Sequence, residues 1–231
     1  MKNILLIGGS YGIGLSIAKE LNGNANVFVA SRTSENLSGL NLTHIPFDAS
    51  NDTLDITALP AAIDGLVYCP GSINLRPFKG LKIDTFESDL KINFIDMVKV
   101  VQTILPQLTS SNQSSIVLFS TVAASMGMPF HTSVAASKAA VEGFAKALAA
   151  EYAPKIRVNV IAPSLTNTPL ADKFLNNEAK QEKSADRHPL KRFGQPEDLA
   201  QMASFLLSDK ASWMTGQILH VDGGMSTLLV N

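Results

Sequence analysis

Three glycines near the start of the chain have the spacing of a phosphate-binding turn. Gly8, Gly12 and Gly14 form a G-x-x-x-G-x-G pattern between an apolar run at 4–7 and a stretch with helical apolar spacing at 13–21. Glycines let the backbone turn tightly and approach a pyrophosphate, which then sits at the amino end of the following helix. Ordinary turns also use glycine, but the strand and helix on either side favour the phosphate-binding interpretation.

The residue after the second apolar run bears on which dinucleotide would bind. That run ends in Ser31-Arg32-Thr33. An acidic residue here would accept hydrogen bonds from ribose hydroxyls and select NAD. Arg32 instead offers a planar fork suited to a 2′-phosphate, and Ser31 or Thr33 could add a hydroxyl donor. The alternative is that Arg32 is an ordinary solvated arginine on the surface. Its position at the end of the second apolar run favours NADP(H) over NAD.

Short apolar runs alternate along the chain with longer helical patterns. We expect strands at 4–7, 27–30, 43–47, 66–69, 115–119, 156–161 and 217–221, and helices at 13–21, 86–105, 133–152 and 196–207. Pro106 should end the second helix. Segment 166–188 is the least regular and most polar, so we expect it to be mobile. Strands separated by helices predict an α/β fold: a Rossmann-type, doubly wound parallel sheet of about seven strands, covered by helices on both faces, in a single domain 1–231.

The composition narrows the classes of function. A net charge of −1 gives no electrostatic case for binding nucleic acid or an anionic membrane. Cys69 is the single cysteine and the four histidines are scattered, so we expect neither a disulfide nor a metal site. No apolar stretch approaches the ~18 residues needed to span a bilayer. The first apolar run is too short for a signal peptide, so the expected location is cytoplasmic.

Several later segments, together with the glycine pattern, resemble the short-chain dehydrogenase/reductase family. The matching segments are 47–49, 68–71, 162–169, 192–198 and 221–224, so the resemblance covers nearly the whole chain. It is strongest to the one-domain branch of β-ketoacyl-acyl-carrier-protein reductases. Ile7 stands where the family usually has threonine. The resemblance implies these cofactor-binding residues: Gly8, Ser10, Tyr11, Gly12, Ile13, Gly14, Arg32, Asp48, Ala49, Pro70, Gly71, Lys138, Pro163, Thr166 and Thr168.

The resemblance also implies a catalytic set, with one member missing. The family transfers a hydride between the nicotinamide and a carbonyl carbon, while a tyrosine supplies the proton. Lys138 and Asn93 match the family's lysine and relay asparagine, and Thr121 stands at its serine position. Val134, four residues before Lys138, stands at the tyrosine position. Valine cannot donate a proton, and losing a positioned general acid costs about 10²–10⁴-fold in rate.

Two hypotheses follow for the function. The first is an NADP(H)-dependent oxidoreductase acting on a small carbonyl or alcohol, using Thr121, Lys138 and Asn93 with His131 or water as the proton donor. Alternatively, His131 is a polar loop residue that faces solvent and donates no proton. The second hypothesis is an NADP(H)-binding protein without turnover, either a sensor or a non-catalytic subunit. The resemblance further implies a substrate lid around 168–190 and a homotetramer or dimer formed through the helices at 94–105 and 134–152.

Overall fold

A computed structural model describes residues 1–229 of the protein. Seven parallel strands form one sheet in the order β3-β2-β1-β4-β5-β6-β7. Their bounds are β1 (Asn3–Ile7), β2 (Asn26–Ser31), β3 (Thr43–Pro46), β4 (Gly65–Tyr68), β5 (Ser114–Phe119), β6 (Ile156–Pro163) and β7 (Ile218–Val221). The predicted seven-stranded, doubly wound parallel sheet is confirmed. The strand order reverses between β1 and β4, which opens a crevice at the carboxyl ends of these strands.

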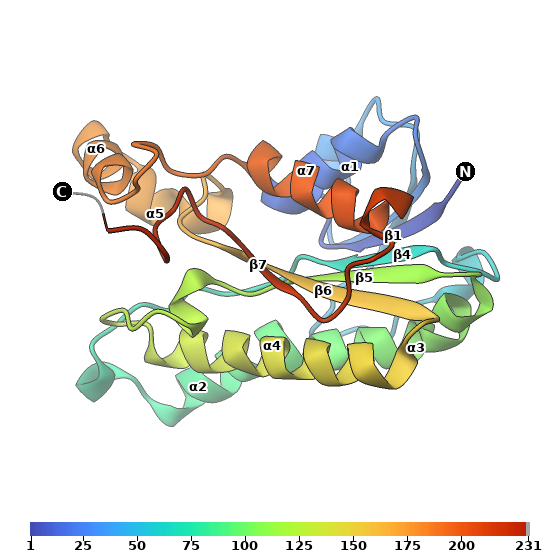
Figure 1. Ribbon diagram of the computed structural model, residues 1–231, viewed down its shortest axis with the longest axis horizontal. Coiled ribbons are helices and arrows are strands. Elements are labelled where there is room, and N and C mark those ends of the chain that lie inside the picture. The colour runs from blue at the N-terminus through green and yellow to red at the C-terminus, as the bar shows by residue number, and fades with distance from the viewer. Residues whose placement is uncertain (230–231) are drawn as a thin grey trace.

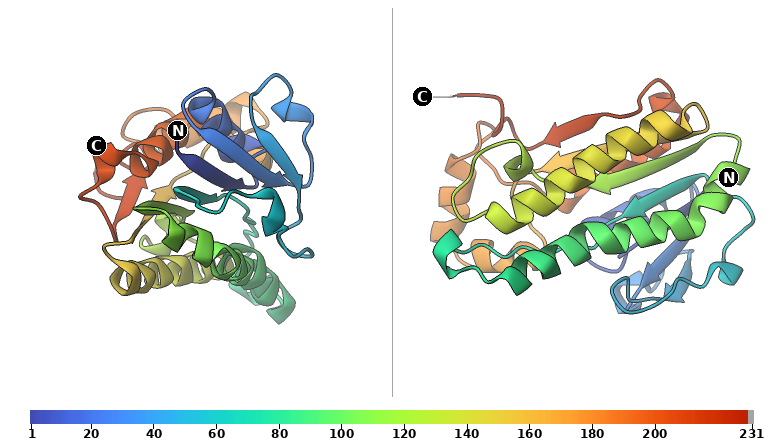
Figure 2. Two further views of the ribbon diagram at one scale, coloured as in Figure 1. Left: turned by 90° about the vertical axis from the view of Figure 1, so that its right-hand side faces the viewer. Right: turned by 90° about the horizontal axis from the view of Figure 1, so that it is seen from below.

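Helices cover both faces of the sheet (Figures 1 and 2). On one face lie α1 (Gly12–Leu21) and α7 (Pro196–Leu207); on the other lie α2 (Ile83–Leu90), α3 (Asp96–Ser110) and α4 (Thr132–Tyr152). Along β1, Leu5 and Ile7 face one apolar core, whereas Ile4 and Leu6 face the other. A strand buried on both faces needs this continuous apolar sequence.

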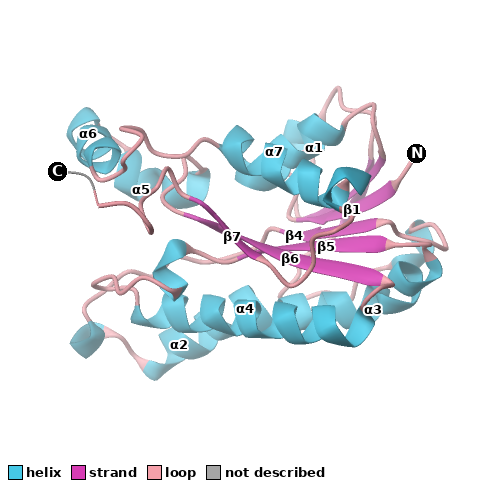
Figure 3. Ribbon diagram, viewed as in Figure 1, coloured by secondary structure: helices cyan, strands magenta, loops and turns pink. Residues whose placement is uncertain are grey.

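Two short helices lie beyond the carboxyl ends of the strands (Figure 3). They are α5 (Asp172–Leu175) and α6 (Glu178–Asp186), within segment 166–188. The sequence pattern predicted no helix in this segment, and one local signal was missed. The side chain of Asn177 accepts a hydrogen bond from the backbone N–H of Lys180 at 3.0 Å, so it caps the amino end of α6.

The helical pattern at 86–105 also differs from its prediction. Lys91–Ile95 form a π-helical turn that separates α2 from α3, and such turns often occur at functional sites. Pro106 does not end α3, which continues to Ser110. Leu108 beyond the proline is fully buried in the core, so packing of the apolar face outweighs the backbone hydrogen bond that proline removes.

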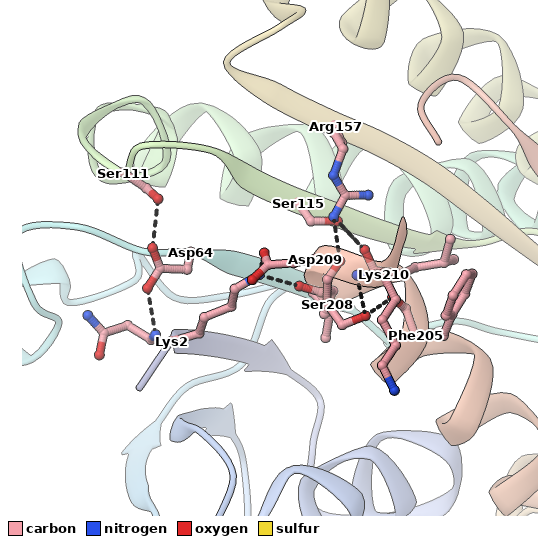
Figure 4. Close-up of polar contacts among 12 residues, drawn as sticks. Lys2, Asp64, Ser111, Ser115, Arg157, Phe205, Ser208, Asp209 and Lys210 are labelled. Carbon is pink, nitrogen blue, oxygen red and sulfur yellow. Dashed lines mark hydrogen bonds and ion pairs between the residues drawn. The ribbon is translucent and has the colours of Figure 1, made fainter. Parts of the chain in front are cut away.

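At the amino ends of the strands, polar side chains join the elements together (Figure 4). Buried Arg157 donates to the backbone carbonyls of Leu206 at 2.8 Å and Ser208 at 3.3 Å, next to the carboxyl end of α7. Asp64 accepts from the hydroxyl of Ser111 at 2.6 Å and from the backbone N–H of Asn3 at 2.8 Å. These bonds provide partners for backbone groups at the end of a helix and at the start of a strand.

Candidate active site

The glycine loop between β1 and α1 has the shape of an anion cradle. Gly8 and Gly12 have positive φ values of 77° and 52°, which glycine adopts without strain. A Cβ at Gly14 would lie 2.3 Å from the carbonyl oxygen of Gly8, so only glycine permits this close packing. No side chain caps the amino end of α1, where Tyr11 is the N-cap residue. Its first N–H groups therefore suit a phosphate group.

Arg32 lies exposed at the end of β2, beside this loop. The hydroxyl groups of Ser10 and Thr33 are 3.2 Å apart, which ties the loop to the end of β2. Ser31, considered above as a donor, is buried and donates its hydroxyl to the carbonyl of Thr33 at 2.8 Å. Of Ser31 and Thr33, the hydroxyl of Thr33 is therefore the better placed to donate a hydrogen bond to a 2′-phosphate.

Asp48 follows β3 and begins a turn. One of its carboxylate oxygens accepts from the N–H of Ser50 and the other from the side-chain amide of Asn51, each at 3.0 Å. The bond from Ser50 and, more weakly, the charge of Arg32 lower the pKa of Asp48. The turn places the adjacent half-buried Ala49 next to the core.

Lys138 and Asn93 meet beside Gly71, at the carboxyl end of β4. A Cβ at Gly71 would lie 3.0 Å from Oδ1 of Asn93 and 3.5 Å from Nζ of Lys138, so the missing side chain makes room for both. Lys138 is buried and donates to the carbonyl of Phe119 at 2.9 Å. Burial lowers its pKa to about 8. Its ammonium group has three donors, so further donors remain for a ligand.

Asn93 lies in the π-helical turn and is held from both sides. Its amide nitrogen donates to the hydroxyl of Ser72 and to the carbonyl of Asp89, each at 2.9 Å, and its Oδ1 accepts from the N–H of Ser72 at 3.2 Å. These bonds fix the orientation of the side-chain amide. The π-helical turn and Gly71 together therefore determine where Asn93 faces the site.

A buried carboxylate, which the sequence did not reveal, supports this arrangement. Asp89 is fully buried and accepts from the side chains of Ser72 at 2.5 Å, Asn74 at 2.7 Å and Ser133 at 2.7 Å. These donors come from the loop after β4 and the first turn of α4. An acidic residue four positions before Asn93, on the same helix face, was the one available signal.

Thr121, Val134 and His131 lie around the same cavity. The hydroxyl oxygen of Thr121 accepts from the N–H of Ala123 at 3.3 Å, so its hydrogen can point to a ligand. Val134 is buried one helical turn before Lys138. His131 is half-buried, and its Nδ1 donates to the carbonyl of Pro129 at 2.7 Å. This bond engages Nδ1 alone, so Nε2 is the ring nitrogen that could contact a ligand.

The cavity has a volume of about 420 Å³ at the carboxyl ends of the strands. Many predicted residues line it: Ile13, Gly71, Asn93, Thr121, His131, Lys138, Pro163, Thr166 and Thr168. The other predicted residues lie outside this lining: Gly8, Ser10, Tyr11, Gly12, Gly14, Arg32, Asp48, Ala49 and Pro70. Pro70 packs against Gly8, with its ring 3.1 Å from the position of a Cβ there. Cys69 also lines the cavity, and burial raises its pKa to about 12, which keeps the thiol protonated.

His188 connects α6 to the sheet and was also missed. It is buried, and its Nδ1 donates to the carbonyl of Ser184 at 2.7 Å. Its Nε2 lies 2.7 Å from the hydroxyl of Ser164, which follows β6, and accepts that hydroxyl's hydrogen in the neutral ring. The bond fixes one end of α6 at the edge of the cavity.

Within residues 1–229, no helix is long and apolar enough to cross a bilayer. No group of three histidine, cysteine, aspartate or glutamate side chains in the same range could hold a metal ion.

Comparisons with known proteins agree with this geometry. The family model described as enoyl-(acyl carrier protein) reductase matches residues 8–226. The 3-oxoacyl-(acyl-carrier-protein) reductase FabG of Chlamydia trachomatis is 32% identical over 97% of each chain. Human dehydrogenase/reductase SDR family member 4 is 32% identical, with 99% of this chain and 88% of the human protein covered. The ligand-free aldohexose dehydrogenase of Thermoplasma acidophilum superposes with a TM-score of 0.90 at 26% identity, over 100% of this chain and 96% of that one. The chain therefore belongs to the short-chain dehydrogenase/reductase family of oxidoreductases, whose members bind a nicotinamide cofactor.

Proposed function

We propose that this protein is an NADP(H)-dependent oxidoreductase that acts on a small carbonyl compound or alcohol. One observation carries the proposal: Lys138, Asn93 and Thr121 line the same cavity as Ile13, which lies in the first turn of α1, between Gly12 and Gly14 of the glycine pattern. Groups that could bind a dinucleotide and groups that could polarise a carbonyl therefore lie side by side. A surface built only to bind nucleotides would not need groups that could polarise a carbonyl.

The glycine loop and the residues around it fit a dinucleotide. The backbone at Gly8, Gly12 and Gly14 would hold the pyrophosphate, because the positive φ values of Gly8 and Gly12 and the close packing of Gly14 on the carbonyl of Gly8 give this turn its shape. Lys138 has donors left for the ribose of the nicotinamide. The bound nicotinamide would supply the hydride. The remaining chemistry belongs to the protein: the hydroxyl of Thr121 would donate a hydrogen bond to the substrate oxygen, and Asn93 would fix the geometry beside Lys138.

Arg32 supports a preference for NADP(H) over NAD(H). It is the cationic side chain at the end of β2, where a 2′-phosphate would accept charge-assisted hydrogen bonds. One structural neighbour gives independent support. The gluconate 5-dehydrogenase of Burkholderia cenocepacia, in complex with NADP and tartrate, superposes with a TM-score of 0.90 at 25% identity, over 99% of this chain and 96% of that one.

By the resemblance, Val134 stands at the position from which the family's tyrosine would deliver the proton. We infer that another group does so here. His131 is one candidate, because its Nδ1 is committed to Pro129 and a protonated ring would present Nε2–H. A cavity water is the other. The same valine favours a second candidate function, an NADP(H)-binding sensor or non-catalytic subunit, since a protein without turnover needs no general acid.

Turnover separates the two functions. The absorbance of NADPH would be followed with a panel of ketones, quinones and 3-oxoacyl thioesters. The proposal expects oxidation of NADPH by at least one member, and His131→Ala should slow it by about 10²-fold or more if His131 donates the proton. His220→Ala, a change at an exposed histidine outside the cavity, is the matched control. Tight NADPH binding with no turnover across the panel would instead support the binding protein.

We further propose that segment 168–190 acts as the lid and that the chain assembles as a homotetramer or dimer through α3 and α4. Alanine is frequent on α4, which permits close approach of a second helix. Light scattering at micromolar concentration should give a mass of two or four chains.

A further inference from the structure

The charges of α6 are segregated onto two faces of the helix. The acidic residues are Glu178, Glu182 and Asp186, and the basic residues are Lys180, Lys183 and Arg187. At ~100° per residue, the acids fall within an arc of ~80° and the bases within a separate arc of ~60°. A solvated helix that only needed charge for solubility would have no reason to separate the signs.

The basic face is the one that lines the cavity. Lys180, Lys183 and Arg187 belong to the cavity lining, whereas no acidic residue among residues 1–229 does so. Lys173 on α5 and Lys138 on the floor add two more cations to the same lining. Asp89 lies behind Ser72, outside the lining, and its carboxylate already accepts three hydrogen bonds. The cavity therefore has an excess of positive charge that its own walls do not balance.

Besides Lys138, the lining has four cations, of which two serve the architecture and two have no role within it. Lys173 donates to the carbonyl of Ile73 at 3.0 Å, and Lys180 donates to the carbonyl of Lys173 at 2.8 Å. These bonds hold α5 and α6 over the site. Within residues 1–229, the charged groups of Lys183 and Arg187 make neither a hydrogen bond nor an ion pair.

The position of this basic face is fixed by the structure. Asn177 caps the amino end of α6, and His188 bonds its carboxyl end to Ser164 after β6. Arg187 directly precedes His188, and Lys183 lies one helical turn earlier. The two cations are thus held at one wall of the cavity, with Thr121 and Lys138 also in its lining.

We propose that the substrate carries an anionic group, a carboxylate or a phosphate, and that Lys183 and Arg187 bind this group while the carbonyl contacts Thr121. This inference rests on the proposed function and specifies its substrate class. Guanidinium and ammonium groups are the donors that proteins use for these anions, and their charge-assisted hydrogen bonds are the stronger ones.

Matched substrates test the proposal, each pair sharing one reacting ketone. Acetoacetate and its methyl ester differ in a carboxylate; acetoacetyl-coenzyme A and S-acetoacetyl-N-acetylcysteamine differ in the phosphates. The double variant Lys183→Gln/Arg187→Gln should raise KM for at least one anionic member by about 10-fold or more, with kcat little changed, because uniform binding is lost. KM for the neutral members should change less than about 2-fold. Glu182→Gln/Asp186→Asn, on the opposite face, is the matched control.

Binding measurements keep this test independent of turnover. Calorimetry on the protein loaded with NADP⁺, which cannot reduce a ketone, would titrate acetoacetate and coenzyme A as probes, and the Lys183→Gln/Arg187→Gln variant should bind at least one of them about 10-fold more weakly. If turnover is absent but this loss appears, the proposed function fails and the anion site stands. Unchanged anion binding in the double variant would overturn the inference. So would a loss confined to NADPH affinity, because the basic face would then serve the cofactor.

Discussion

The two ends of the sheet treat charge in opposite ways. At the amino ends, Arg157 is buried and donates to carbonyl groups of the chain, and Lys2 pairs with Asp209 at 2.5 Å. At the carboxyl ends, Arg32, Lys183 and Arg187 make no such pairs within residues 1–229, and Lys138 is buried with donors to spare. Both ends contain cations, so charge alone does not mark function. What marks the site is charge that the fold positions and leaves uncommitted.

This contrast predicts that changes at the carboxyl end alter binding and rate, whereas changes at the amino end alter stability.

The largest rate effect is expected at Val134. Val134→Tyr would place a phenol one turn before Lys138 and should raise carbonyl reduction by at least ~10²-fold, the lower end of a general acid's contribution. Overpacking could cost ~1–3 kcal/mol, so a thermal melt comes first. A folded variant that binds NADPH and stays inert would show that Val134 is not what limits turnover.

Lys138 should make stability depend on pH. Burial lowers its pKa from 10.5 to about 8. Below pH 8 both states hold the proton, and between 8 and 10.5 the unfolded state binds more protons, so stability rises with pH in this window. Lys138→Met should therefore be more stable than wild type at pH 7, by up to roughly 3 kcal/mol, and this advantage should shrink towards pH 10. Urea unfolding at both pH values measures it; an advantage independent of pH would contradict the account.

Arg157 tests the amino end. Arg157→Met keeps much of the side-chain volume but removes one of the two side-chain donors to the carbonyl of Leu206, which keeps Ser115, and removes the Arg157 donor to the carbonyl of Ser208, so we expect a loss of about 1–3 kcal/mol in the free energy of unfolding. NADPH affinity should not change. Lys2→Met removes an exposed ion pair at the same end and should cost less than about 1 kcal/mol. A clear loss of NADPH binding in Arg157→Met would remove the distinction between the two ends.

The smallest expected effect concerns the choice of cofactor. Arg32→Asp should reverse a preference for NADPH over NADH of about 10-fold, because it removes a charge-assisted contact and adds repulsion to the 2′-phosphate. Lys19→Asp, at an exposed cation on α1, makes the same charge change away from the loop. Equal affinities of wild type for the two cofactors in calorimetry would refute the role of Arg32.

Sequence reasoning succeeded where one local pattern determines one structure. Apolar runs predicted all seven strands, and the glycine spacing located the turn whose φ values only glycine adopts easily. It failed where distant segments decide the outcome. Pro106 stays inside α3 because Leu108 is buried by neighbouring elements.

The candidate site divides in the same way. Lys138, Asn93 and Thr121 were found through motifs, and the structure brings them to one cavity. Asp89 was missed because its donors, Ser72 and Ser133, are far apart in the sequence. The basic face of α6 was missed because segment 166–188 was predicted only to be polar and irregular, and only the contacts of α6 show which face lines the cavity.

The central claim is that the carboxyl end of the sheet is built to hold NADP(H), whether or not turnover follows. Calorimetric titration of wild type and Gly14→Val with NADPH tests it most directly. The account predicts one binding site per chain in wild type. In Gly14→Val affinity should fall by about 100-fold or more, because the new Cβ would meet the carbonyl of Gly8. Gly80→Ala, where a Cβ would meet nothing within 4 Å, should bind like wild type. Absence of NADPH binding by the folded wild-type chain, or equal binding by Gly14→Val, would contradict the claim.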